Sequence, residues 1–233
     1  AALAWRYANG NAEALRMSGD IYEAEPMALA ERIASVAEAG EHRLQSDFLG
    51  RYGQAYLQTE RADNGRAVWV HYGYGKGHSH RDCLNLGLHA KNIDMLPELG
   101  YPEYTGNWPK RGAWTSNTIS HNTLLVGDER SGYSPGGRLG LFCVQPPLRV
   151  LEASSKTAYP DLERYHRTVA LVDVSDDDSY VFDVFRAVGG ANHRLSWHGP
   201  GAQAVIDGVR MVRQQTGTFA GPDVEFTCLE GER

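Results

Sequence analysis

Residues 166–187 read HRTVALVDVSDDDSYVFDVFRA, and they are the clearest indication of the fold class. Two runs rich in valine, phenylalanine and tyrosine, at 166–174 and 180–187, flank three consecutive aspartates at 176–178. β-Branched and aromatic residues favour strands, whereas aspartates favour turns because their side chains hydrogen-bond to nearby backbone. This segment therefore predicts two antiparallel strands joined by a turn.

The same alternation of short β-forming runs and turn residues continues on both sides of this hairpin. Further strands are predicted at 52–57, 67–72, 122–126, 139–144, 148–153, 193–198, 203–206 and 224–229. Glycine, aspartate and proline separate many of these runs. Dense short strands with such punctuation are typical of an antiparallel β-sandwich, which we predict for residues 49–233.

Residues 1–48 have a different composition, rich in alanine, glutamate, leucine, methionine and arginine, which are good helix formers. Within 26–37 (PMALAERIASVA) the apolar residues Leu29, Ile33 and Val36 recur at helical spacing. We therefore predict a mainly β protein in which a short helical segment, 1–48, precedes the sandwich.

Composition and charge restrict the classes of partner. The 233 residues are 42% hydrophobic and carry a net charge of −6, which argues against nucleic acid as a partner. No run approaches the roughly 20 apolar residues that a membrane-spanning helix needs. The three cysteines are widely spaced and form neither a disulfide framework nor a zinc-knuckle pattern.

Three histidines and a glutamate, His78, His80, Glu98 and His121, are the strongest candidates for chemistry. If 77–90 begins in a strand, His78 and His80 point to one face, because side chains two residues apart share a face. Imidazole both binds metals and titrates near neutral pH, so one histidine can hold a metal while the other transfers protons. Glu98 and His121 would complete a site with three protein ligands, which is typical of zinc.

Three motifs follow one another in this region: GHSHRDCLN at 77–85, LPELGYP at 96–102 and SHNT at 120–123. In this order they resemble those of the heparinase II/III-like polysaccharide lyases, a family that includes related alginate lyases. Weaker similarity follows at YHR (165–167), YVFDVFR (180–186), Gly189-Gly190 and His193, so that the resemblance covers roughly residues 50–200. It implies a metal-containing β-sandwich.

The resemblance also implies roles for single residues. His80, Glu98 and His121 fall on the metal ligands, although the family usually has an aspartate where this chain has Glu98. Zinc is the expected ion, and the longer glutamate arm leaves Mn²⁺ or Ca²⁺ as alternatives. His78 falls on the histidine that lies beside the substrate and assists proton transfer or charge neutralisation. Asp82 is a candidate to accept a hydrogen bond from a ligand histidine.

The activity that the resemblance implies is β-elimination on an anionic, uronic-acid-containing polysaccharide. The family's catalytic tyrosine lies in a helical (α/α) toroid, so we expect 1–48 to be the tail of that toroid and the chain to be a fragment, inactive alone. Because the net charge is negative, an anionic polymer must meet a local basic patch, for which Arg81 and Arg111 are candidates, with Tyr74 lining a sugar subsite. The substrate class implies a secreted or periplasmic location.

Two other functions stay open from the sequence. The chain could be a non-catalytic carbohydrate-binding sandwich with a structural metal. It could also be a metal-dependent glycan hydrolase that uses a metal-bound water as nucleophile. Both rank below the lyase, because the three ordered motifs match the lyase family and no paired glycosidase carboxylates stand out.

Overall fold

In the part of the chain that the computed structural model describes, the residues form mostly strands and loops. The described residues are 45–59, 65–73, 79–91, 93–98, 111–133, 136–201 and 205–224. The helix predicted at 26–37 lies outside them, and strand β1 (Asp47–Leu49) crosses the predicted boundary at residue 49. Within the described part of the chain, no helix has the length and apolar character needed to cross a membrane.

The first sheet has five strands in sequence order, each antiparallel to the next. After β1 they are β2 (Gln54–Gln58), β3 (Ala67–His71), β4 (Asn85–Ala90) and β5 (Ile93–Asp94). Side chains of β2 and β3 alternate between buried and half-buried, as expected of strands with one face on a core.

The second sheet has four antiparallel strands in the order β10-β9-β8-β7. They are β7 (Arg138–Gln145), β8 (Leu148–Ser154), β9 (Arg164–Asp173) and β10 (Ser179–Val188). The hairpin predicted from residues 166–187 is confirmed, since Ser179 pairs with Asp173 and Val188 with Arg164. The three aspartates form the connection between its strands.

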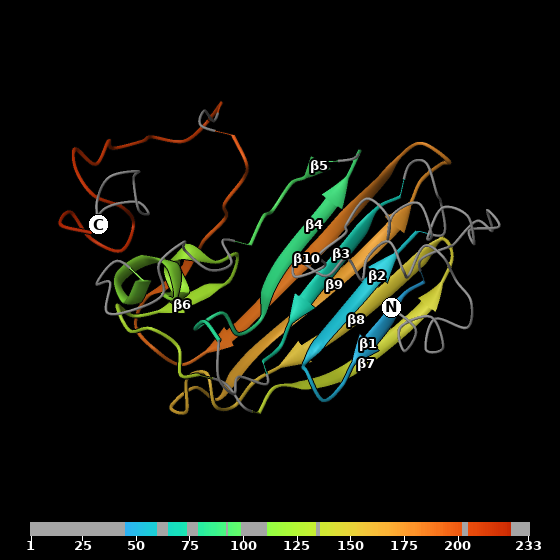
Figure 1. Ribbon diagram of the computed structural model, residues 1–233, viewed down its shortest axis with the longest axis horizontal. Helices are drawn as coiled ribbons and strands as arrows, with labels where there is room; N and C mark the ends of the chain where they lie inside the picture. Colours follow the sequence, from blue (N-terminus) through green and yellow to red (C-terminus); the bar gives the residue numbers. More distant parts are fainter. Residues whose placement is uncertain are drawn as a thin grey trace, which may run out of the picture. The chain divides into compact units, whose positions relative to one another are not determined.

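The two sheets pack face to face, and Figure 1 shows the strands of one sheet lying over those of the other. The core between them is one apolar cluster with members from both sheets. Leu57, Val70 and Leu86 come from the first sheet, and Leu151 and Val169 come from the second. The predicted antiparallel β-sandwich is therefore confirmed.

A small third sheet and two short helical turns lie beside one end of the sandwich. The sheet pairs β6 (Leu124–Val126) with β11 (His193–Leu195). The turns are a π-helical turn η1 (Arg111–Thr115) and a 3-10 turn η2 (Thr118–Ser120), which the sequence analysis did not predict. They occupy the residues directly before His121, so the path of these turns sets the position of the His121 side chain.

Several predicted strands are shorter than expected or differ in position. The strand at 122–126 begins only at Leu124, and the strand at 193–198 ends at Leu195. Residues 205 and 206 do not form a strand, while the rest of 203–206 and most of 224–229 lie outside the described residues. Residues 122, 123 and 196 are hydrogen-bonded but lie outside the sheet ladder: the Leu86 N–H donates to the Asn122 carbonyl at 3.1 Å, and the Ser196 N–H donates to the Thr123 carbonyl at 3.0 Å.

His78 and His80 were predicted to lie at the start of a strand within 77–90, but the strand in this segment starts after His80. It begins at Asn85, and the described residues before it form a loop that contains His80. A turn closes this loop, with the Asn85 N–H donating to the Asp82 carbonyl at 2.9 Å, and Leu84 has a φ of 60°. The argument that His78 and His80 share a strand face is therefore wrong for His80.

Gly87 lies directly opposite Trp69 in the first sheet, and an added Cβ at Gly87 would overlap the indole ring. Gly87→Ala is expected to lower the free energy of unfolding by about 1–3 kcal/mol, because the indole must move to admit the methyl group. The midpoint of thermal unfolding checks this. Gly112→Ala is the control, since an added Cβ there meets no atom within 4 Å. Equal loss of stability in both variants would contradict the packing argument.

Candidate functional site

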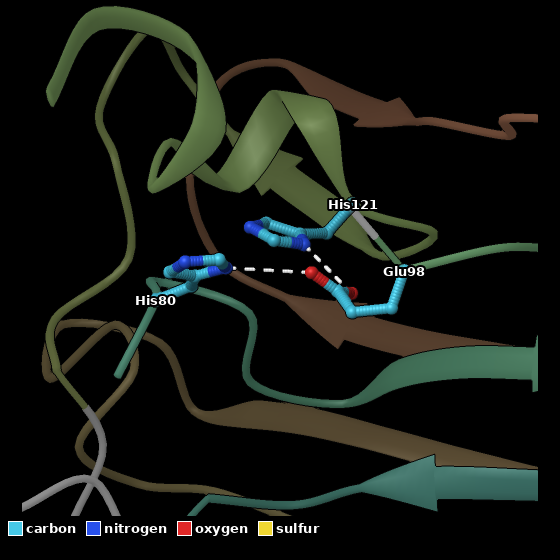
Figure 2. A group of neighbouring side chains, drawn as sticks. All are labelled: His80, Glu98 and His121. Carbon is cyan, nitrogen blue, oxygen red and sulfur yellow. Dashed lines mark hydrogen bonds and ion pairs between the residues drawn. The ribbon is translucent and has the colours of Figure 1, made fainter. Parts of the chain in front are cut away.

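Three side chains from separate segments meet at the end of the sandwich that carries the helical turns. His80 comes from the loop before β4, Glu98 from the segment after β5, and His121 from the residue that follows η2. One nitrogen or oxygen of each lies within 4.8 Å of the other two. Figure 2 shows the two imidazoles lying side by side, each turned toward one oxygen of the Glu98 carboxylate. The structure thus brings together the three predicted metal ligands.

The carboxylate bridges the two neighbouring imidazole rings, whose centres lie 5.2 Å apart. The His80 Nδ1 is 3.3 Å from one oxygen, Oε1, and the His121 Nδ1 is 3.0 Å from the other, Oε2. The His121 side chain is fully buried and that of His80 is 8% exposed, whereas that of Glu98 is 33% exposed. The two imidazoles of the cluster are therefore buried, whereas solvent reaches the Glu98 side chain.

Two of the three separations between ligand atoms in this cluster suit a small divalent ion. Two donors on a tetrahedral ion with bonds of about 2.0–2.1 Å lie about 3.3 Å apart. The two nitrogen–oxygen separations, 3.3 Å and 3.0 Å, are close to that length. Two imidazoles and a carboxylate are also ligand types that such ions take in proteins. His80, Glu98 and His121 therefore fit a metal.

The electrostatics of the cluster favour an ionised carboxylate. Burial raises the pKa of Glu98, but the hydrogen bonds with His121 and His80 outweigh it and hold this pKa well below the usual value. Burial lowers the pKa of His121, yet the hydrogen bond and the negative charge of Glu98 raise it above its usual value overall. Glu98 is thus charged at neutral pH, which is the state in which a carboxylate binds a cation.

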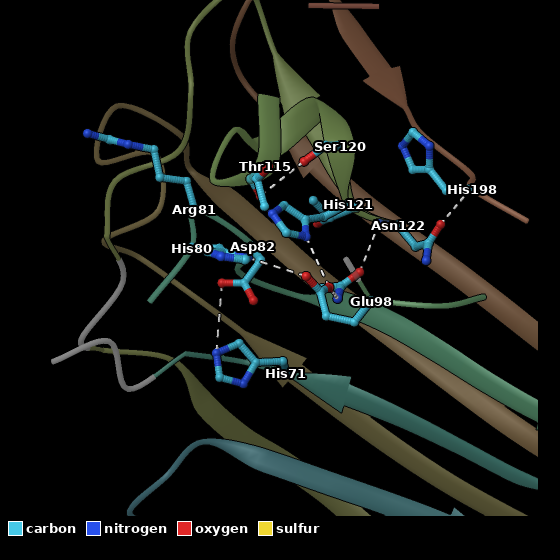
Figure 3. Close-up of polar contacts among 12 residues, drawn as sticks. His71, His80, Arg81, Asp82, Glu98, Thr115, Ser120, His121, Asn122 and His198 are labelled. Carbon is cyan, nitrogen blue, oxygen red and sulfur yellow. Dashed lines mark hydrogen bonds and ion pairs between the residues drawn. The ribbon is translucent and has the colours of Figure 1, made fainter. Parts of the chain in front are cut away.

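Asn85 connects Glu98 to the segment of His121. Its Nδ2 donates to the Glu98 Oε2 at 2.6 Å, and its Oδ1 accepts from the Asn122 N–H at 2.8 Å. The Asn122 Oδ1 in turn accepts from the backbone N–H of His198 at 2.7 Å, as Figure 3 shows. The sequence favours a structural hydrogen-bonding role for Asn85, which lies within the motif at 77–85, and these two bonds agree with it; its partners were not predicted.

The neighbours of His80 make contacts away from the ligands. The Asp82 Oδ1 lies 3.9 Å from the His71 Nε2, a pair that Figure 3 also shows, and its charge contributes to the raised pKa of His121. Arg81 Nη1 donates to the Ser131 carbonyl at 2.7 Å, and its Cζ lies 4.2 Å from the centre of the Tyr133 ring. Arg81 thus fixes the loop at 131–133 next to the cluster.

The other predicted site residues are not placed with their side chains. His78 and Tyr74 lie outside the described residues, and for Arg111 only the backbone, at the start of η1, is described. Their roles as proton-transfer group and substrate contacts stay predictions, and so does substrate binding by Arg81.

The chain is similar to known proteins in sequence and in fold. The sequence model of the family described as Heparinase II/III-like, C-terminal, matches residues 31–230. An alginate lyase from Stenotrophomonas maltophilia (strain K279a) is 26% identical in an alignment of 139 residues, and the match covers 53% of this chain and 17% of that enzyme.

Solved structures show the same fold. Heparan sulfate lyase HepC from Pedobacter heparinus superposes with a TM-score of 0.59 and 18% identity, and covers 77% of this chain. A heparinase III gives a TM-score of 0.60 and 16% identity over 75% of this chain. The match spans only 28% of the length of each of these two proteins. Their likeness therefore concerns the sandwich and not a whole enzyme.

Proposed function

Because this chain belongs to the heparinase II/III-like C-terminal family, we propose that it is the sandwich part of a polysaccharide lyase. The reaction is β-elimination on a polymer that contains uronic acid. The observation that carries the proposal is the cluster of His80, Glu98 and His121, in which motifs far apart in the sequence come within 4.8 Å. The named activities of the relatives, on heparan sulfate and on alginate, both concern uronate polymers.

The reaction needs three chemical contributions. The C5–H bond of a uronate is weakly acidic, so the adjacent carboxylate must be neutralised before a base can remove the proton. The C4–O4 bond then breaks, a C4=C5 double bond forms, and an acid donates a proton to the departing O4. We assign charge neutralisation or proton exchange to His78, which lies two residues before the cluster residue His80. The catalytic tyrosine would come from a helical toroid.

The ion that best suits the cluster is Zn²⁺, with Mn²⁺ as the alternative. Zinc takes histidine nitrogens together with a glutamate oxygen, whereas Ca²⁺ takes about 6–8 oxygen ligands. When bound, the ion would supply a positive charge that links His80, Glu98 and His121. In this proposal it orders the loop that leads to His78, while the protons are moved by side chains of the protein.

Contacts with an anionic polymer require basic side chains, because the chain as a whole carries a charge of −6. Among the candidates, Arg81 is the one whose side chain the structure describes; it follows the cluster residue His80 in the chain, and its guanidinium contacts Ser131 and Tyr133. Arg111 and Tyr74 are the further proposed contacts. A polymer of this kind is met outside the cytoplasm, so we propose a secreted or periplasmic location.

The test uses the complete polypeptide that carries this chain. It is incubated with heparan sulfate, chondroitin sulfate, hyaluronan and alginate, and the ultraviolet absorbance of the C4=C5 double bond is followed together with new reducing ends. A rise in both on one polymer supports the lyase. New reducing ends without absorbance would point to a metal-dependent hydrolase. Binding without either signal would point to a carbohydrate-binding module.

A further inference from the structure

Arg167 is a fully buried arginine whose guanidinium joins three parts of the sandwich. On β10, Asp183 accepts two hydrogen bonds, from Nε at 2.8 Å and from Nη2 at 2.9 Å. From the same guanidinium, Nη1 donates to the Leu84 carbonyl at 2.7 Å and to the Asn122 carbonyl at 2.5 Å. Four of the five N–H donors of an arginine are thus used, two on a carboxylate and two on loop backbone.

The two carbonyl groups belong to the segments that carry the metal cluster. Leu84 precedes Asn85, whose side chain donates to Glu98, and Asn122 follows the ligand His121. Leu84 has a φ of 60°, a conformation that residues other than glycine keep only when their surroundings enforce it. The bond from Arg167 to its carbonyl is one of the contacts that enforce it.

We propose that Arg167 is a positioning residue for the metal centre. By bonding to both carbonyl groups it sets the distance between the loop of Asn85 and the segment of His121, and so the distance between Glu98 and His121. It acts through backbone and not by touching the ion. This inference rests on the metal centre proposed above. In it, a residue of the second sheet controls the positions of the proposed metal ligands.

Only arginine can make this set of contacts. Its planar fork presents donors in two directions, whereas a lysine ammonium is a single point that cannot reach a carboxylate and two carbonyl groups together. The Arg167 Cζ also lies 5.3 Å from the centre of the Phe185 ring and 5.5 Å from that of Trp197. These aromatic faces limit the directions that the guanidinium can take.

A second buried ion pair provides a matched control. The side chain of Arg149 on β8 is 4% exposed, and its Nη1 donates to the Asp173 Oδ2 at 2.6 Å. In the sheet, Arg149 pairs with Leu171 of β9. Leu171 lies four residues along β9 from Arg167, which corresponds to about 13 Å. Loss of this arginine should therefore lower stability without a change at the metal centre.

The experiment compares Arg167→Met, Arg167→Lys and Arg149→Met in the 233-residue chain, at a temperature where circular dichroism shows each to be folded. Zn²⁺ affinity is measured by competition with a chromophoric chelator, and Co²⁺ absorption reports the coordination geometry. Both Arg167 variants are expected to bind Zn²⁺ about 10–100-fold more weakly, as is usual when a group that orients a metal ligand is lost. Their Co²⁺ spectra should also change, while Arg149→Met should match the wild type in both readouts.

Each outcome decides between the alternatives. Wild-type affinity and an unaltered Co²⁺ spectrum in Arg167→Lys would show that Arg167 serves the core alone and would overturn the inference. No Zn²⁺ affinity in the wild type would overturn the metal centre and this inference with it. If neither Arg167 variant folds, the test is the rate at which the guanidinium Nε–H protons of the wild type exchange with solvent, measured with and without Zn²⁺. Zn²⁺ should slow exchange at Arg167 more than at Arg149, and equal slowing at both would overturn the inference.

Discussion

Replacement of His78 with alanine in the complete polypeptide is expected to lower kcat on the uronate polymer by at least about 100-fold, because a positioned acid–base group contributes about 10²–10⁴-fold. Bound metal should stay at the wild-type level, since the proposed ligands His80, Glu98 and His121 are intact. The two readouts are the absorbance of the unsaturated product and the metal content of the purified protein.

The control for this variant is His166→Ala. His166 lies half-buried on β9, outside the metal cluster, so its loss should leave both activity and metal content unchanged. Loss of metal in His78→Ala would show that His78 is itself a ligand, and the division of roles would then be wrong. Full activity with full metal content would remove His78 from the mechanism.

Replacement of Glu98 with glutamine is expected to weaken Zn²⁺ binding by at least about 100-fold, since even residues that only orient a ligand contribute about 10–100-fold. The amide keeps the shape of the side chain but removes the charge that both His80 and His121 contact. The wild type should also unfold at a higher temperature with Zn²⁺, because an ion that binds only the folded state stabilises it. That shift should be absent in Glu98→Gln.

The matched control for the lost charge is Glu152→Gln. The Glu152 side chain is 34% exposed and that of Glu98 is 33% exposed, so the two substitutions differ mainly in location. Glu152→Gln should retain the Zn²⁺-dependent shift. His121→Ala should lose it as Glu98→Gln does, and a shift of wild-type size in both cluster variants would mean that Zn²⁺ binds elsewhere on the chain.

The fold was predictable because its signals are local. A hairpin such as 166–187 is encoded by β-forming residues and by the turn propensity of three aspartates, and both act over a few residues. The boundaries were less predictable. Strand β4 begins at Asn85 and not earlier, because a turn at Asp82 closes first, and Leu84 takes a φ of 60° that its residue type does not favour.

The candidate ligands were predictable for a different reason. Histidine and glutamate in three ordered motifs indicated a metal centre, and the structure brings His80, Glu98 and His121 together. The partners of the residues around them were not predicted. Asn85 donates to Glu98 through a side-chain amide, and Arg167 donates to backbone carbonyl groups, which any residue type supplies.

Sequence alone thus determined the class of fold, the net charge of −6 and the three candidate side chains that the structure brings together. The tertiary structure determined how those side chains are held. Arg167 donates to the carbonyl groups of residues 83 and 45 positions earlier in the chain. Such contacts exist only after the two sheets have packed, because packing excludes water and leaves each buried donor to find its partner within the protein.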